Sequence, residues 1–135
     1  MIVLDASVLI AHLDSSDGHH AAARRLLEQS GGAPLAASAI TLAETLVSPA
    51  RNGRLQDAES ALRRLGVEEL AIGGGDAARL STLRAGTGLK MPDCCVLLAA
   101  LEREATLASF DAALLASARE LKLETAPEEA PTSSA

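Results

Sequence analysis

The sequence predicts an α/β fold in which helices flank a short, mostly parallel central sheet. Short β-prone apolar runs alternate along the chain with helical patterns of ten or so residues. The length of 135 residues suits one domain. Apolar residues make up 48% of the chain but aromatic residues only 1%, so the core must be aliphatic and largely helical.

The first third of the chain is predicted to be a strand, two helices and a second strand. Ile2-Val3-Leu4 is a β-prone run, and the apolar spacing from Val8 to Leu13 is helical. Helical periodicity resumes over residues 19–30 and stops at Gly31-Gly32. A brief second strand is expected over residues 34–37.

Two more helices and an edge strand follow. The Ser38 hydroxyl suits the N-cap of a helix that Ser48-Pro49 is expected to end. A turn at Asn52-Gly53 precedes a fourth helix over 54–65. A third strand is expected over 67–72, and its two glutamates place it at the edge of the sheet.

The remaining third repeats the alternation. Gly73-Gly74-Gly75 precedes a helix over 76–85, and Pro92 suits the first turn of an apolar helix that continues to Arg103. A buried strand is expected over 105–109, a helix over 111–121 and a last strand over 122–125. From residue 126 the composition predicts a disordered tail over 126–135.

Composition and charge exclude some functions and set expectations about location. Without Trp or Tyr and with a single Phe, the chain cannot form the aromatic surfaces of RRM or OB-type RNA-binding domains. Its net charge of −6 is the wrong sign for a simple nucleic-acid binder. The adjacent Cys94 and Cys95 are expected to be buried free thiols. Lacking a basic leader and a long apolar span, the protein is expected to be soluble and cytoplasmic.

Four acids are candidates for a shared site. Asp5 and Asp111 follow predicted strands, and ligand sites of parallel sheets lie beyond the carboxyl ends of the strands. Glu44 interrupts an apolar helix, and Asp93 begins another, so neither is expected to be fully solvated. Each acid also has an ordinary explanation: Asp111 as an N-cap, Asp93 as a partner of the helix dipole, Glu44 as half of an ion pair and Asp5 as a hydrogen-bond acceptor.

Converging carboxylates would require protons or cations. Two carboxylates about 5 Å apart repel by roughly 3 kcal/mol at an effective dielectric constant of 20. A site made only of carboxylate oxygens selects Mg²⁺ or Mn²⁺ over zinc. The three histidines, His12, His19 and His20, lack the spacing of a zinc site and are expected at the surface or at helix ends.

At these residues the sequence resembles the PIN-domain ribonucleases, and among them the VapC-type toxins of bacterial toxin–antitoxin pairs. The resemblance covers residues 1 to about 125, a single PIN-like nuclease domain with a three-layer sandwich fold. It is carried by Ile2 to Ser7, Ser38 to Glu44, Met91-Pro92-Asp93 with the apolar helix after it, and Thr106 to Asp111.

The resemblance implies an Mg²⁺- or Mn²⁺-dependent endoribonuclease that hydrolyses RNA phosphodiester bonds. It places Asp5, Glu44, Asp93 and Asp111 at the metal, and it makes Ser7 and Ser109 supporting or phosphate-contacting hydroxyls. It also implies a homodimer and a VapB-type antitoxin, for which the apolar helices at Leu42 to Val47 and Leu55 to Leu65 are candidate surfaces. Candidate RNA-contacting residues are Arg24, Arg25, Arg51, Arg54, Arg84 and Lys90.

Three alternatives are weighed against this interpretation. A HAD-type phosphatase needs a second Asp at position 7, which is Ser7, and a receiver domain needs a Lys-Pro pair, which Met91 interrupts here. Both are disfavoured. A non-catalytic PIN-like interaction module stays open, although the presence of all four acids counts against it.

Overall fold

The computed structural model describes residues 1–128 and contains one five-stranded sheet. The strand order is β3-β2-β1-β4-β5, and all four pairings are parallel, which confirms the predicted α/β class. The strands are β1 (Ile2–Leu4), β2 (Leu35–Ser38), β3 (Val67–Leu70), β4 (Thr106–Ala108) and β5 (Thr125–Ala126).

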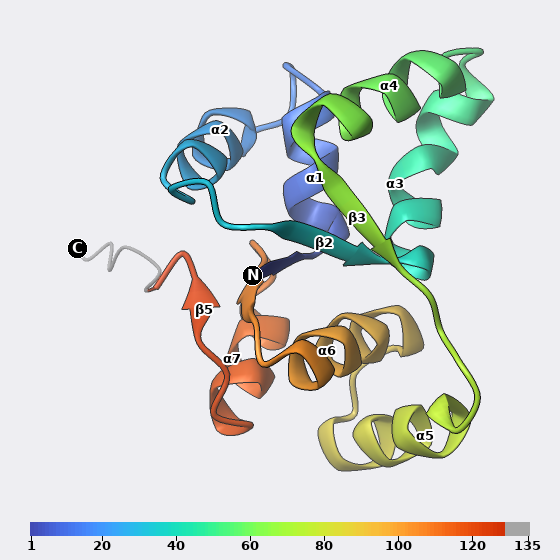
Figure 1. Cartoon of the computed structure of the whole chain (residues 1–135), viewed down its shortest axis with the longest axis vertical. Helices are drawn as coiled ribbons and strands as arrows, with labels where there is room; N and C mark the ends of the chain where they lie inside the picture. The colour runs from blue at the N-terminus through green and yellow to red at the C-terminus, as the bar shows by residue number, and fades with distance from the viewer. Residues whose placement is uncertain (129–135) are drawn as a thin grey trace.

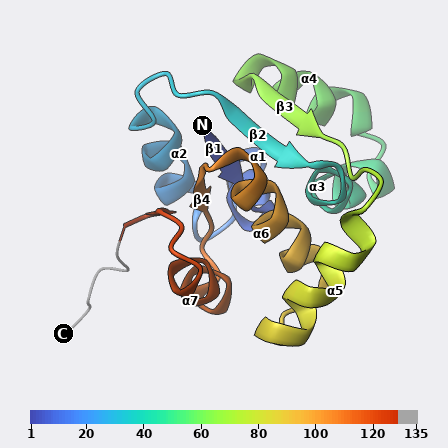
Figure 2. The ribbon, with the colours of Figure 1, turned by 60° about the horizontal axis from the view of Figure 1, so that its bottom comes forward.

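The helices form one layer on each side of the sheet (Figures 1 and 2). The first layer holds α1 (Ala6–Leu13), α2 (His20–Glu28), α3 (Ala39–Arg51) and α4 (Leu55–Leu65). The second holds α5 (Asp76–Thr87), α6 (Met91–Arg103) and α7 (Ala112–Glu120). Right-handed crossovers explain this division, since the chain moves from β1 towards β3 in its first half and from β1 towards β5 in its second.

The core follows from the alternation of side chains along each strand. Val3 and Leu107 face α6 and α7, and their cluster includes Val96, Leu97 and Leu114. Their neighbours Leu4 and Ala108 belong to the opposite cluster with α1 to α4. Because both faces of the sheet are covered, the inner strands β1, β2 and β4 are largely apolar, as parallel strands usually are.

Local signals in the sequence explain several element boundaries. The Ser38 hydroxyl accepts a hydrogen bond from the Ile40 N–H at 3.3 Å and caps α3 as predicted. Gly66 ends α4 in the left-handed conformation, with φ of 82°. The expected edge strand is confirmed, because β3 closes one side of the sheet and both of its glutamates are exposed.

Three predicted boundaries were wrong. Helix α3 continues through Pro49 to Arg51, because a proline in the final turn removes only one N–H group from the helix. Strand β3 stops at Leu70, two residues early. The last strand lies at Thr125–Ala126 rather than over 122–125, because Lys122 takes a left-handed turn, with φ of 68°.

The predicted tail is only partly described. Ala126 of β5 pairs with Ala108 of β4, and the Arg119 guanidinium donates to the Glu128 carbonyl at 3.1 Å. Contacts with the rest of the domain therefore extend to residue 128. Residues 129–135 lie outside the described part of the chain, and a disordered tail there stays a prediction. Among residues 1–128, no helix has the length and apolarity needed to cross a membrane.

Truncating a core leucine tests this packing. Leu107 of β4 is fully buried between the sheet and the second helix layer. We expect Leu107→Ala to lower the free energy of unfolding by about 2–5 kcal/mol, measured by urea denaturation. The control is Leu121→Ala, at a residue that is 37% exposed, and it should cost clearly less than Leu107→Ala because less apolar surface is lost and no closed cavity forms. Equal losses in the two variants would contradict the described core.

Candidate functional site

The candidate site lies where the carboxyl ends of β1, β2 and β4 meet. The chain leaves β1 towards one helix layer and leaves the neighbouring strand β4 towards the other. The two connections therefore diverge just beyond the carboxyl ends of these strands. Such a switch point is where open parallel sheets bind ligands. Asp5 follows β1, and Ser109 and Asp111 follow β4, as the sequence predicted.

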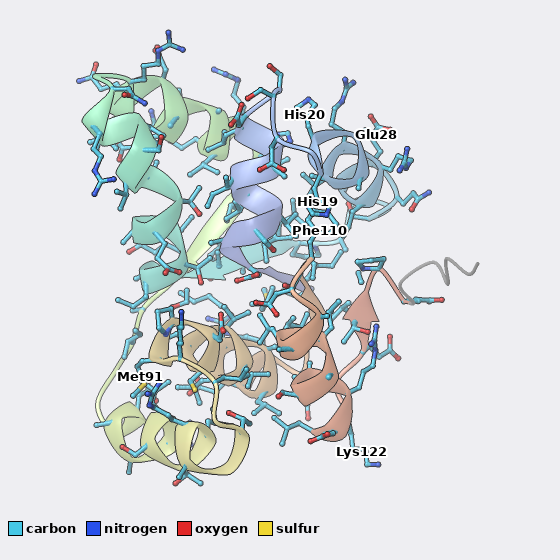
Figure 3. All side chains as sticks on the ribbon, turned by 180° about the vertical axis from the view of Figure 1, so that it is seen from behind. His19, His20, Glu28, Met91, Phe110 and Lys122 are labelled. Carbon is cyan, nitrogen blue, oxygen red and sulfur yellow. The ribbon has the colours of Figure 1, made fainter. Side chains whose placement is uncertain are left out.

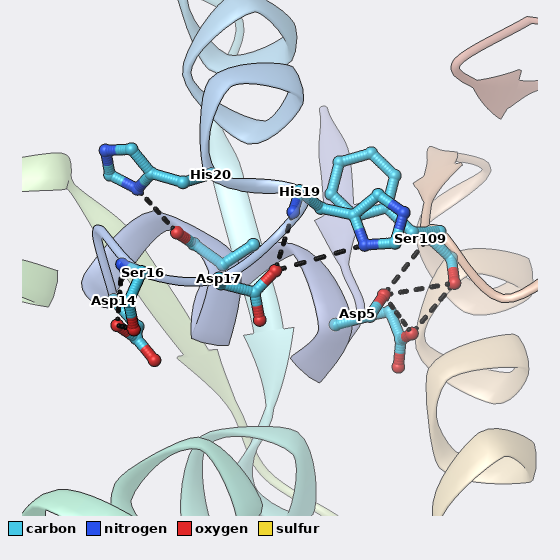
Figure 4. Close-up of polar contacts among 10 residues, drawn as sticks. Asp5, Asp14, Ser16, Asp17, His19, His20 and Ser109 are labelled. Atoms are coloured by element: carbon cyan, nitrogen blue, oxygen red, sulfur yellow. Dashed lines mark hydrogen bonds and ion pairs between the residues drawn. The ribbon is translucent and has the colours of Figure 1, made fainter.

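Asp5 is the most buried of the four candidate acids, at 7% exposed. Its Oδ2 accepts hydrogen bonds from the Ser7 and Ser109 hydroxyls, each at 2.8 Å (Figure 4). Ser109 is itself fully buried. A buried carboxylate needs such partners, and here both are hydroxyl groups, one from each side of the switch point.

The two serines also fix the backbone after β4. The Phe110 N–H donates to the Ser7 hydroxyl at 3.0 Å, and the Asp111 N–H donates to the Ser109 hydroxyl at 2.9 Å. Each hydroxyl therefore accepts one backbone hydrogen bond while it donates to Asp5. The network makes Ser7 and Ser109 positioning residues for Asp5, and it places Asp111 two residues further on.

Asp111 caps helix α7. Its Oδ1 accepts from the Ala113 and Leu114 N–H groups at 2.9 and 3.2 Å. The ordinary explanation of this acid is thus correct, and it does not exclude a second role, because these bonds engage one carboxylate oxygen. Asp111 is exposed at the surface of the site.

Ionisation of Glu44 and Asp93 is made unfavourable by burial and by neighbouring carboxylates. Burial raises the pKa of the Glu44 carboxyl, and the nearby charge of Asp5 raises it further, although much of the side chain is exposed. Burial also raises the pKa of the Asp93 carboxyl. The negative charges of Asp5, Asp111 and Glu44 raise it further, and the positive charge of Lys90 lowers it. Asp93 thus lies within the electrostatic reach of all three other acids.

The donor set fits a hard divalent cation better than any other metal. The four acids offer only oxygen ligands, and their mutual repulsion favours a bound positive charge. Within residues 1–128, no three or more His, Cys, Asp or Glu side chains are close enough together, in their present rotamers, to hold a metal ion. The acids therefore share one region without forming a closed set of ligands.

Two of the six candidate basic residues and two of the histidines have contacts within the described residues. Arg24 lies 3.9 Å from Glu28, and the Arg84 guanidinium donates to the Leu89 carbonyl at 3.0 Å. His20 Nδ1 lies 2.7 Å from the Ala11 carbonyl oxygen, and His12 Nδ1 is buried without a hydrogen-bond partner among the described residues. Cys94 and Cys95 are buried and free, as predicted.

Sequence reasoning missed two features of the site. The ring of Phe110 stacks on the ring of His19, which comes from the loop before α2 (Figure 3). A groove of about 510 Å³ runs between α1, α3 and α4, and Glu44 lies on its wall with Ile10, Pro49 and Arg54. Phe110 could have been suspected from its place between Ser109 and Asp111, but nothing in the sequence pairs it with His19.

The fold and the acidic switch point define a class of α/β domains that carry carboxylates at the carboxyl ends of a parallel sheet, and comparison with protein families identifies the family. The model of the PIN domain matches residues 2–121, so the chain belongs to the PIN-domain family. The predicted resemblance and the PIN-like fold are confirmed. A search of curated proteins returned no significant match.

Solved structures with the same fold include proteins of toxin–antitoxin systems. A toxin–antitoxin complex from Klebsiella pneumoniae is 27% identical, with a TM-score of 0.70, covering 82% of this chain and 87% of that one. VapC20 of Mycobacterium tuberculosis, a Sarcin-Ricin loop cleaving toxin, is 18% identical, with a TM-score of 0.64 and coverage of 87% and 95%. VapBC2 from Rickettsia felis, bound to a promoter DNA fragment, is 17% identical, with a TM-score of 0.66 and coverage of 93% and 97%.

The charge repulsion at Asp93 predicts an unusual effect on stability. A carboxyl whose pKa is raised on folding stabilises the protein least when it is ionised, so stability is lost as pH rises from the unfolded pKa through the folded one. In a chelating buffer at pH 7, we expect Asp93→Asn to raise Tm by roughly 1–3 °C, a small gain because solvent screens half-buried charges.

Thermal scans of both proteins between pH 4 and pH 7 check this expectation. The advantage of Asp93→Asn should shrink towards pH 4, because the folded state then takes up a proton at this carboxyl and loses the charge repulsion, while the unfolded state, whose pKa is lower, is still partly ionised. Glu120→Gln, on exposed α7, serves as the matched control and should leave Tm unchanged. A variant less stable than the wild type at pH 7 would show that Asp93 stabilises the fold.

Proposed function

We propose that this PIN domain is a divalent-metal-dependent endoribonuclease that acts as the toxin of a toxin–antitoxin pair. Family membership and the fold shared with toxins of this kind support the proposal. One of these neighbours is described as cleaving the Sarcin-Ricin loop, and two are toxin–antitoxin assemblies. RNA substrates and unpaired cysteines favour the cytoplasm as its place of action.

The observation that carries the proposal is the arrangement around Asp5. A carboxylate that is 7% exposed is held at the switch point of the sheet by two serine hydroxyls, and it raises the pKa of both Glu44 and Asp93. A purely structural aspartate would not need two further acids beside it. Carboxylates that lie close enough to repel one another, with pKa values raised by burial and by each other, are typical of a functional site.

Each residue has a defined part in this proposal. Asp5, Glu44 and Asp93 would hold Mg²⁺ or Mn²⁺, and the uncapped oxygen of Asp111 would complete the site. Ser7 and Ser109 hold the Asp5 carboxylate in one orientation through its Oδ2. When bound, the cation supplies an activated water and stabilises charge on the scissile phosphate. Lys90, which lowers the pKa of Asp93, is placed to offset part of the negative charge.

The decisive test is the loss of metal-dependent RNA cleavage. Asp5→Asn and Asp93→Asn each remove a charged ligand while keeping the size of the side chain, so we expect cleavage to fall by about 100-fold or more. Cleavage of total RNA with Mg²⁺ or Mn²⁺ is followed on gels, with Glu120→Gln as the matched control. Full activity in a correctly folded Asp93→Asn protein would defeat the proposal.

A non-catalytic PIN-like interaction module is the second candidate. The observation in its favour is that no three acidic, His or Cys side chains in the described residues already stand as a metal site. Calorimetric titration with Mn²⁺ separates the two candidates. A nuclease should show binding that Asp93→Ala abolishes, whereas an inert module should show none in either protein.

We further propose a VapB-type antitoxin as the partner and a homodimer as the assembly. The groove between α1, α3 and α4 suits a bound antitoxin segment, because it is partly apolar and a segment seated there would lie against Glu44 on its wall. Exposed apolar side chains, Ile10, Val47 and Leu55, lie on the same helices and belong to or adjoin the predicted surfaces. Light scattering of the purified chain would show whether its mass is that of two copies.

The groove can be tested apart from catalysis. Ile10 is 39% exposed and lines the groove, so Ile10→Glu should weaken antitoxin binding by about tenfold or more without touching the acids. Affinity is measured by titrating the purified antitoxin, and RNA cleavage by the variant alone should match the wild type. Unchanged affinity would place the antitoxin on another surface.

A further inference from the structure

One ring stack lies beside the carboxylates without a part in the mechanism above. The rings of His19 and Phe110 are stacked, with centroids 4.8 Å apart and planes 14° apart. Phe110 is the only Phe in a chain without Tyr or Trp. The His19 side chain nevertheless keeps 62% of its surface exposed, so the face of its ring turned away from Phe110 is open to solvent.

Both rings are anchored by hydrogen bonds of the neighbouring backbone. The Phe110 N–H donates to the Ser7 hydroxyl, which donates to Asp5, so two hydrogen bonds join this residue to the proposed metal site. On the other side, the His19 N–H donates to Asp17 Oδ1 at 2.8 Å (Figure 4). Hydrogen bonds thus hold the backbone on both sides of the stack, and the exposed His19 ring offers a π surface at the edge of the site.

An acidic site benefits from substrate contacts that do not depend on charge. The carboxylates repel RNA phosphates until a cation is bound, and the Arg84 guanidinium already donates to the Leu89 carbonyl. Stacking a nucleobase on an aromatic or imidazole ring adds affinity irrespective of net charge and of base identity. A third ring can continue the stack on the open face of His19.

We propose that the His19–Phe110 stack is a nucleobase-binding subsite that holds the base of a nucleotide close to the scissile phosphate. The inference rests on the proposed ribonuclease function and deepens it, because it assigns a residue that positions the substrate. A small stack of this type differs from the multi-aromatic surfaces that the composition excludes: it holds one base rather than reading a sequence.

The test measures binding of a fluorescein-labelled, twelve-nucleotide oligouridine RNA by anisotropy in Mg²⁺ buffer. All proteins are full-length and carry Asp93→Asn to prevent cleavage. A series of the same oligonucleotide with one abasic nucleotide at successive positions finds the base that matters. We expect one abasic position to weaken binding about 5- to 100-fold, the range of a lost base stack.

Variants at His19 distinguish stacking from other roles. His19→Leu should weaken binding of the intact oligonucleotide by the same factor and should be insensitive to the abasic position. His19→Trp should restore both affinity and sensitivity. Phe110→Leu, which removes the supporting ring, should behave like His19→Leu. Leu121→Ala, at an exposed residue just after α7, should match the parent protein. The slope of affinity against salt concentration should not change in His19→Leu.

Several results would overturn the subsite. If His19→Leu lowers Tm but binds RNA like the parent, the stack only joins the two loops. A smaller salt slope in His19→Leu would show a phosphate contact, and lost antitoxin affinity with unchanged RNA affinity would assign the stack to the protein partner. If the wild type cleaves RNA and His19→Leu binds normally, the subsite alone fails. If the wild type neither cleaves nor binds RNA, the proposed function fails with it.

Discussion

The structure depends on one buried carboxylate, that of Asp5. Burying a charge is costly unless hydrogen bonds replace the lost water, and the Ser7 and Ser109 hydroxyls supply them at a single oxygen. Ser7 lies in the first turn of α1, and Ser109 follows β4. The same bonds therefore join the segments that leave the neighbouring strands β1 and β4. The backbone at Phe110 and Asp111 is held by the same hydroxyls, so the geometry of the whole region follows from this carboxylate.

Helix N-termini stabilise most of the remaining acids without any bound cation. Asp93 lies in the first turn of α6, and Asp111 caps α7, where the partial positive charge of the helix terminus favours a carboxylate. Asp5 likewise precedes α1. Glu44 alone lies in the middle of a helix, and its exposure lets water share the cost. The cluster can therefore persist without metal, at the expense of stability that shows in the raised pKa values.

Two unusual features of the composition, the excess of acids and the single Phe, meet in the same region of the fold. Overall charge is unfavourable for an RNA-binding protein, but part of it is concentrated where a divalent cation would reverse its effect. The single Phe is half-buried: it packs against the core cluster of the first helix layer and stacks on the exposed His19 imidazole. Within residues 1–128, the one ring stack therefore lies beside the residues that the proposed chemistry requires.

The sequence by itself determined the α/β class, the order of the elements, the cap at Ser38 and the edge position of β3, because these follow from local periodicity and turn chemistry. It also determined that Asp5, Ser109 and Asp111 would meet, since carboxyl ends of parallel strands share one edge of the sheet. Only the tertiary structure decided that Pro49 stays within α3, that β5 lies at Thr125–Ala126 and that His19 stacks on Phe110. These depend on contacts between distant segments, as does the spacing of the four carboxylates, and no local pattern encodes such distances.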